Sequence, residues 1–431
     1  MTLSWFSIVR LGLIQMALGG IVVLTTSTLN RLMVVELALP AVLSGFLVAL
    51  HYGIQITRPN WGYRSDTGNS RTRWIILGMA ALSVGGLLAA YGVVLMAGAF
   101  VLGLALSILA YALIGLGVGA SGTSLLALLA TGTAPNRRAA AATITWLMMI
   151  AGIALTAATV GAFLDPYTPQ LLLTIVAIVT GGAFATTCLA VAGIEAKTSF
   201  AKRDRDEMPF LDGLKEVWAE PAARLFTIFV FLSMTAYFMQ ELILEPYAGF
   251  VFGFTPGEST SLSGAQNGGV FIGMLTVGIA ASGLGIGALR TWVVAGCLLS
   301  ALALVSIAVL GQIGLRGLFT PAVIFLGFSN GMFAVAAIGS MMQLAGEGRS
   351  SREGTRMGLW GAAQAIAAGF GGLVGAAFVD CMRLILVSEA TAFGLVFTFE
   401  ALLFVGAALM ALAILSRGRA TVSSAALVPG E

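Results

Sequence analysis

One histidine, His51, stands in an apolar stretch of the chain, and Gln55 follows it by four residues. Side chains four residues apart share a face of an α-helix, so this pair is expected to project together. A lone histidine in an apolar helix is usually a hydrogen-bonded packing residue, although imidazole can also relay a proton or ligate a metal. The spacing predicts a polar spot in an apolar helix and leaves its role open.

Charged side chains interrupt two other apolar runs near their ends. Arg31 and Glu36 follow the apolar run 9–29. Glu241 and Glu245 lie four residues apart at the end of the apolar run 223–247, the seventh along the chain. Because an isolated charge within a membrane is costly, we expect Arg31 to pair with Glu241 or Glu245. The pair would be either a clamp between two parts of the molecule or a gate with a protonatable site. Pro246 is expected to end the helix that carries both acids.

Three further ionisable residues lie in the last two apolar runs. Glu400 falls near the middle of the final run, where an acid is a functional candidate by default. The alternative is a protonated carboxyl group bonded to a neighbouring helix. Asp380 and Arg383 are three residues apart, which predicts a local ion pair.

The pattern lacks the groups that most enzymes and metal sites need. Cys188, Cys297 and Cys381 form no CxxC pair, so neither a disulfide framework nor a zinc site is indicated. There is no Ser/His/Asp set and no phosphate-binding loop. We therefore expect a protein that is not an enzyme and has no covalently bound cofactor. The net charge of +3 sits in short loops and does not predict nucleic-acid binding.

The elements that must position these side chains are membrane helices. The chain is 58% hydrophobic and 10% charged, whereas a soluble domain carries roughly 25% charged residues. No run alternates as a membrane β-strand does. Twelve runs are long enough to cross a bilayer, which takes about 20 residues. They fall at residues 9–29, 37–57, 74–96, 99–130, 139–164, 168–193, 223–247, 260–285, 290–311, 317–345, 355–382 and 391–415.

The distribution of lysine and arginine predicts the orientation of these helices. The termini and the even-numbered loops hold 19 of the 22 basic residues, so both termini are expected in the cytoplasm. The chain is then expected to comprise a six-helix bundle (1–193), a cytoplasmic linker with an amphipathic helix (194–222), a second six-helix bundle (223–415) and a cytoplasmic tail (416–431).

The two predicted bundles resemble each other. A similar stretch ends at Asp165 beside the fifth run and at Asp380 within the eleventh, and Trp146 and Trp360 precede these aspartates by 19 and 20 residues. Two six-helix repeats joined by a linker are typical of the major facilitator fold, whose site lies between the repeats near mid-membrane. The sequence therefore predicts an all-α membrane protein of that fold. Its expected cavity amides are Gln15, Gln55, Gln240, Gln266, Asn267, Asn330 and Gln364.

The loop between the second and third runs carries a degenerate form of the major facilitator loop pattern. Gly62 and Asp66 have the expected spacing, and Arg71 and Arg73 follow them. An aspartate there can sit against the N-terminus of a helix from the other bundle and hold the cytoplasmic side closed. The alternative is an ordinary positively charged hairpin.

Three longer stretches carry a more specific resemblance. These are "TLNRLMVVELALPA" (28–41), "ELILEPYAGFVFG" (241–253) and "VALHYGIQITRPNWGYRSD" (48–66). They resemble the PucC/LhaA family of bacteriochlorophyll delivery proteins, a branch of the major facilitator superfamily, over nearly the whole chain. At 431 residues the chain is similar to the shorter branch, whose genes tend to lie among pigment-synthesis genes.

The resemblance implies an assembly factor for light-harvesting antennae. It would lie in the bacterial inner membrane, cytoplasmic or intracytoplasmic, and handle bacteriochlorophyll or a precursor. Its partners would be the lipid bilayer, antenna polypeptides and bacteriochlorophyll synthase. His51, Gln55 and Trp360 then become candidates for pigment binding. Since Mg²⁺ prefers oxygen ligands, Gln55, water or a backbone carbonyl would serve as well as His51.

Two other functions remain open from the sequence. A proton-coupled transporter of a small amphiphile would use Glu241, Glu245 or Glu400, and would not tolerate their change to amides. A scaffold that has lost transport would tolerate cavity substitutions but not changes to its lipid-facing surface.

Overall fold

A computed structural model describes residues 3–58, 61, 70–134, 137–195, 218–347 and 353–425. Every regular element in these ranges is helical. Eleven helices are long and apolar enough to span a membrane, and a twelfth apolar helix, Ala41–Thr57, is shorter. Side chains such as Val101, Ile178, Leu189 and Leu302 are exposed on the outside of the bundle. An apolar outer surface of this kind fits a multi-pass membrane protein.

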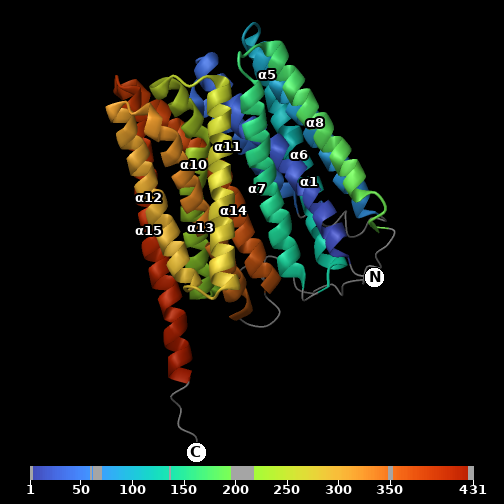
Figure 1. Cartoon of the computed structure of the whole chain (residues 1–431), viewed down its shortest axis with the longest axis vertical. Helices are drawn as coiled ribbons and strands as arrows, with labels where there is room; N and C mark the ends of the chain where they lie inside the picture. Colours follow the sequence, from blue (N-terminus) through green and yellow to red (C-terminus); the bar gives the residue numbers. More distant parts are fainter. Residues whose placement is uncertain are drawn as a thin grey trace, which may run out of the picture.

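The first half of the chain forms one group of helices, coloured blue to green in Figure 1. Its hydrophobic core includes Ile8, Leu47, Leu82, Ile114 and Leu172. Its elements are α1 (Trp5–Val23), η1 (Leu24–Thr28), α2 (Leu29–Arg31), η2 (Leu32–Glu36), α3 (Ala41–Ile54), η3 (Gln55–Thr57), α5 (Arg71–Met96), α6 (Phe100–Gly132), α7 (Arg138–Phe163) and α8 (Pro169–Val191).

The second half forms the other group, coloured yellow to red in Figure 1. Aromatic side chains dominate its core, and Tyr247 contacts Phe252, Phe319, Phe393 and Phe397. Its elements are α10 (Pro221–Phe252), α11 (Pro256–Val277), η6 (Gly278–Gly283), α12 (Leu289–Ile313), α13 (Arg316–Glu347), α14 (Glu353–Ile385) and α15 (Glu389–Ala425).

The two halves meet mainly along two helix pairs. α7 packs against α11, and α14 packs against α3. Small residues allow the close approach: Gly161 of α7 lies against α11, and Gly45 of α3 lies against α14. The two contacts join corresponding positions of the two halves, since one of the repeated aspartates follows α7 (Asp165) and the other lies in the last two turns of α14 (Asp380).

Two helix ends differ from the sequence prediction. The first helix does not stop at residue 29 but continues through α2 and η2 to Glu36. The seventh, α10, does not end at Pro246 but continues to Phe252, where Gly253 adopts a positive φ of 65°. Proline removes one backbone hydrogen bond, and a membrane helix surrounded by other helices accommodates that loss. The polar run Thr25–Thr28 is also helical because it is buried against the other half.

Several predicted features lie outside the described residues. Gly62 and Asp66 of the proposed latch fall there, as does 196–217, which holds most of the predicted linker helix. Arg71 and Arg73 are described and stand in the first turn of α5.

A candidate site in the cavity between the halves

A cavity with a volume of about 350 Å³ lies between the two halves. This volume is at the low end of the roughly 300–1,000 Å³ typical of pockets for drug-sized ligands. Much of the wall is apolar, with side chains such as Leu18, Trp146, Ile150 and Phe238. Six of the seven predicted amides line it, namely Gln15, Gln55, Gln240, Gln266, Asn267 and Gln364. The seventh, Asn330, instead accepts a hydrogen bond from Ser300 inside the second half.

His51 and Gln55 share the wall of this cavity with Arg58. Arg58 donates a hydrogen bond to the Gln55 side-chain oxygen, and the Gln55 amide nitrogen lies 3.0 Å from His51 Nε2. An amide nitrogen can only donate, so His51 Nε2 accepts and the neutral imidazole carries its proton on Nδ1. Helix geometry explains the arrangement, since the three side chains follow one another at intervals of four and three residues.

Several buried polar atoms in the cavity wall have no hydrogen-bond partner within the described part of the chain. They are Gln15 Oε1, His51 Nδ1, both side-chain polar atoms of Gln240, and Glu245 Oε2. Burying an unpaired polar group costs about 1–3 kcal/mol. These groups share one space, so a ligand or water in the cavity would relieve them together.

Glu241 and Glu245 of α10 place two acids on one face at the cavity wall. Glu245 is 2% exposed and accepts a hydrogen bond from Ser27 of η1. The Ser27 contact joins the two halves, and Ser27 lies within the predicted first helix (9–29).

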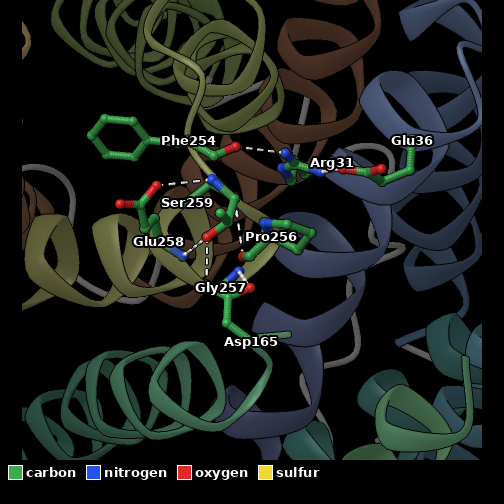
Figure 2. Close-up of polar contacts among 9 residues, drawn as sticks. Arg31, Glu36, Asp165, Phe254, Pro256, Gly257, Glu258 and Ser259 are labelled. Atoms are coloured by element: carbon green, nitrogen blue, oxygen red, sulfur yellow. Dashed lines mark hydrogen bonds and ion pairs between the residues drawn. The ribbon is translucent and has the colours of Figure 1, made fainter. Parts of the chain in front are cut away.

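Arg31 does not form the predicted ion pair with either acid. Its ion pair is with Glu36, five residues along the same segment, and its Nη2 donates to the backbone oxygen of Phe254 at 2.7 Å. Figure 2 shows Arg31 between these two partners. The extended first helix explains the difference, because it brings Glu36 within reach of a side chain that is only 2% exposed. Arg31 still links the halves, but through a carbonyl oxygen.

Asp165 makes a second link between the halves, also visible in Figure 2. It follows α7 and contacts the start of α11. Thr255 Oγ1 donates to Asp165 Oδ2 at 2.5 Å, and the Gly257 backbone N–H donates to Oδ1 at 3.2 Å. A carboxylate at a helix N-terminus satisfies free backbone donors and interacts favourably with the helix dipole.

Asp380 makes the corresponding link from α14 to α3, so its predicted pairing with Arg383 is wrong. The backbone N–H groups of Ala41 and Val42 donate to its two oxygens at 3.0 and 2.7 Å. Arg383 pairs with Glu389 at 2.8 Å instead. The free N–H groups at the start of α3 bind the Asp380 carboxylate. Arg383 therefore pairs with Glu389, at the start of α15.

The remaining candidates lie away from the cavity. Glu400 is fully buried in α15, and neither carboxyl oxygen has a hydrogen-bond partner among the described residues. Trp360 packs edge-on against Phe226 at 4.9 Å, in the core of the second half. The backbone N–H of Arg71 donates to Glu195 at 2.7 Å, and that of Arg73 donates to Ser70 at 3.3 Å.

Sequence reasoning missed the roles of three kinds of residue. Arg58 was read as a loop charge, although its position three residues after Gln55 signalled a shared face. Ser27 gave no signal because nothing in the sequence brings it to α10. Asp165 and Asp380 were visible as the ends of the repeat, and their shared position could have signalled a shared role.

Comparison with known proteins completes this description. The model of the PUCC protein family matches residues 28–419. This chain belongs to the PucC family. It is 68% identical over 423 residues to the bacteriochlorophyll synthase 44.5 kDa chain of Rhodobacter capsulatus, covering 98% of both chains. It is 29% identical over 440 residues to Protein PucC of the same species, covering 95% of this chain and 92% of that one.

The fold matches solved transporters. The crystal structure of a D-xylose-proton symporter aligns with a TM-score of 0.73 and 16% identity, covering 94% of this chain and 97% of that one. The predicted all-α major facilitator fold and the family resemblance are therefore confirmed. The side of the membrane on which the termini lie stays a prediction.

Proposed function

We propose that this PucC-family protein is a non-enzymatic assembly factor. It would bind bacteriochlorophyll or a precursor in the cavity between its halves and deliver it to light-harvesting antenna polypeptides in the inner membrane. The observation that supports this most is a largely apolar cavity with unpaired amide, imidazole and carboxyl groups on its wall.

The chemistry of the cavity suits a tetrapyrrole pigment. Such a ligand is large, flat and mostly apolar, and carries a few carbonyl groups and a central metal. The apolar wall would contact the ring, while the amides of Gln15, Gln240 and Gln364, which line the cavity, would bind polar groups at its edge. At about 350 Å³ the cavity would enclose part of the pigment, and a long ester chain would extend between helices toward the lipid.

The proposed partners follow from the pigment. Antenna polypeptides would receive it, and bacteriochlorophyll synthase would supply it. The relative named as a bacteriochlorophyll synthase chain supports a place near pigment synthesis, given 68% identity. The major facilitator fold, in turn, favours ligand movement over catalysis.

Purification from native photosynthetic membranes in a mild detergent tests this function. We expect a near-infrared pigment band to elute with the protein, together with antenna polypeptides identified by mass spectrometry. Preparations that contain neither pigment nor photosynthetic polypeptides would refute the proposal. A scaffold without pigment transport would retain the polypeptides and lack the band.

A second candidate, a proton-coupled transporter of a small amphiphile, is favoured by one observation. Glu241 and Glu245 line the cavity between the halves without an ion pair to a basic side chain in the described ranges. A carboxyl group in that position can exchange a proton as the halves move. Glu241→Gln and Glu245→Gln would each abolish proton uptake by reconstituted vesicles if this function holds. Uptake that is absent from wild-type vesicles would exclude it.

A further inference from the structure

We propose that the protein ligand to the magnesium of the bound pigment is a carboxylate oxygen of Glu245 and not the imidazole of His51. This inference rests on the proposed pigment-binding function and assigns the group that recognises the metal. Both residues line the same cavity, so the choice between them depends on which one has a free lone pair.

His51 has its lone pair engaged. Arg58 donates to the Gln55 oxygen, which fixes the orientation of the amide, and the Gln55 nitrogen then donates to His51 Nε2 at 3.0 Å. The other ring nitrogen, Nδ1, therefore carries the proton and offers a donor. A donor cannot ligate a metal ion, but it can bond to a carbonyl oxygen at the edge of the pigment.

The same relay disfavours Gln55, the oxygen ligand that the sequence offered beside His51, because both of its polar atoms already have partners. Its side-chain oxygen accepts from Arg58 and its nitrogen donates to His51. The His51–Gln55–Arg58 chain is thus complete within the first half and presents donors to the cavity.

Glu245 has a free oxygen in a fixed orientation. Ser27 donates to Oε1, while Oε2 makes no hydrogen bond of normal geometry within the described residues, although the Ser263 hydroxyl lies near the carboxyl group. The residue is 2% exposed and lines the cavity, so the partner of that oxygen would be a ligand or a water molecule held in the cavity. Magnesium is a hard ion that prefers carboxylate oxygen, and a hydrogen bond to a ligating carboxylate is the usual way to orient it.

No ion pair within the described residues involves Glu245. The Arg31 guanidinium acts electrostatically on Glu245, but its ion pair is with Glu36, and Glu241 adds another acid one turn away. A buried carboxylate without its own counter-ion is costly. The magnesium of a bound pigment would act as a Lewis acid toward Oε2 and would leave Arg31 paired with Glu36.

Glu241 is the natural comparison for Glu245. It stands on the same helix face and lines the same cavity, but it is more exposed. Of the two acids, Glu245 is the one with a buried oxygen that lacks a hydrogen-bond partner among the described residues, and this selects it as the ligand.

The test compares two probes, bacteriochlorophyll a and its magnesium-free form, bacteriopheophytin a. Dissociation constants are measured by absorption titration of the full chain in lipid nanodiscs. We expect the wild type to bind the magnesium pigment about tenfold or more tightly than the metal-free one. Loss of an outer-sphere partner typically costs 10–100-fold in metal affinity, so Ser27→Ala should reduce this preference as well.

The variants separate the candidate ligands. Glu245→Gln leaves the amide oxygen on Ser27 and an NH₂ group at the ligand position, and Glu245→Leu removes both oxygens. Both should abolish the preference and change the absorption band that reports magnesium coordination. Glu241→Gln and His51→Phe should retain the preference and the band.

A preference that disappears in His51→Phe or Glu241→Gln and survives in both Glu245 variants would overturn the assignment. Equal binding of the two probes by the wild type would also overturn it, while leaving the proposed function in place. If the wild type binds neither probe, the proposed function itself fails.

Discussion

Two aspartates at corresponding positions join the two halves, yet the helix ends that they contact differ. Asp380 contacts α3, whose N-cap residue is Pro40 and provides no side-chain hydrogen bond. Asp165 contacts α11, whose N-cap residue Thr255 forms a reciprocal capping box with Glu258. Asp380 is half-buried and Asp165 is exposed. Both halves therefore have the aspartate, but α3 depends on Asp380 for its cap more than α11 depends on Asp165.

The difference indicates how the halves are held together. α3 has no cap of its own, so the other half supplies it, and separation of α14 from α3 would leave free N–H groups at the start of α3. α11 is capped within its own half, so separation from α7 costs less. The α3–α14 contact is therefore expected to be the stronger of the two. If the halves separate at the end where the two aspartates lie, separation should begin between α7 and α11.

A third acid, Glu195, provides a reference within one half. It follows α8 and accepts hydrogen bonds from Ser70 Oγ at 2.7 Å and from the backbone N–H groups of Arg71 and Thr72 at 2.7 and 3.1 Å. It binds the first backbone N–H groups of α5, as Asp380 does for α3, but α5 also has its own N-cap, Ser70, and α5 and α8 belong to the same half. Its loss should affect stability without changing the contact between the halves.

The largest effect is expected for Asp380→Ala. This change removes two charge-assisted hydrogen bonds from an otherwise uncapped helix, which should cost about 2–3 kcal/mol. The measurement is the melting temperature in detergent, combined with the distance between spin labels on the outer ends of α3 and α14. A variant that melts like the wild type, with an unchanged distance distribution, would contradict the difference between the two contacts.

Asp165→Ala should have a smaller effect, about 1 kcal/mol, because Thr255 and Glu258 still cap α11. Since Asp165 is exposed, salt should screen its contribution more than that of Asp380. Melting curves at low and high ionic strength measure both effects. If Asp165→Ala destabilises the protein more than Asp380→Ala, the argument from capping is wrong.

Pro40→Ser should give α3 a cap of its own. A serine N-cap contributes about 0.5–1 kcal/mol, so the loss caused by Asp380→Ala should be smaller in the Pro40→Ser background. A double-mutant cycle on melting temperature measures this coupling. Strictly additive effects would mean that Asp380 does not act as the cap of α3.

Glu195 should produce the smallest effect and one that depends on pH. Although partial burial opposes it, the hydrogen bonds from Arg71, Ser70 and Thr72 lower the pKa of Glu195 below its ordinary value of 4.5. A lowered pKa in the folded state gives a stabilisation that is present above the ordinary pKa and lost as the pH falls through the folded-state value. The melting temperatures of wild type and Glu195→Gln should therefore differ at pH 7 and converge under acid conditions. If the difference in melting temperature between wild type and Glu195→Gln stays constant down to acid pH, ionisation of Glu195 is not the cause of its stabilising effect.

Much of the fold could be predicted from the sequence because hydropathy and charge act locally. The apolar runs, the division into repeats and six of the seven cavity amides follow from residue type and helical spacing. Pro246 was misread because its effect depends on the helices around α10, which local rules do not include.

The partners of individual charges could be predicted less well, since they depend on contacts between distant segments. Arg31 was expected to pair with an acid of the other half, but the continuation of the first helix to Glu36 provides a nearer one. Asp380 was assigned to Arg383 because the sequence shows only neighbours along the chain, and the start of α3 is 339 residues away. Ser27, which fixes Glu245, lies 218 residues from it.

The central proposal is that the cavity between the halves holds the pigment, and two glycines allow a direct test. Gly122 lines the cavity, and a Cβ there would have one neighbour within 4 Å, Leu18 at 3.8 Å. Gly181 is exposed on α8 and has none. Leucine at Gly122 would therefore fill the cavity, whereas leucine at Gly181 would point outside it.

The measurement is the titration of bacteriochlorophyll a into nanodiscs that contain wild type, Gly122→Leu or Gly181→Leu. We predict saturable binding by the wild type and by Gly181→Leu, and at least a tenfold loss of affinity in Gly122→Leu, equivalent to about 1.4 kcal/mol. Equal binding by all three proteins would contradict the proposal that the cavity is the pigment site.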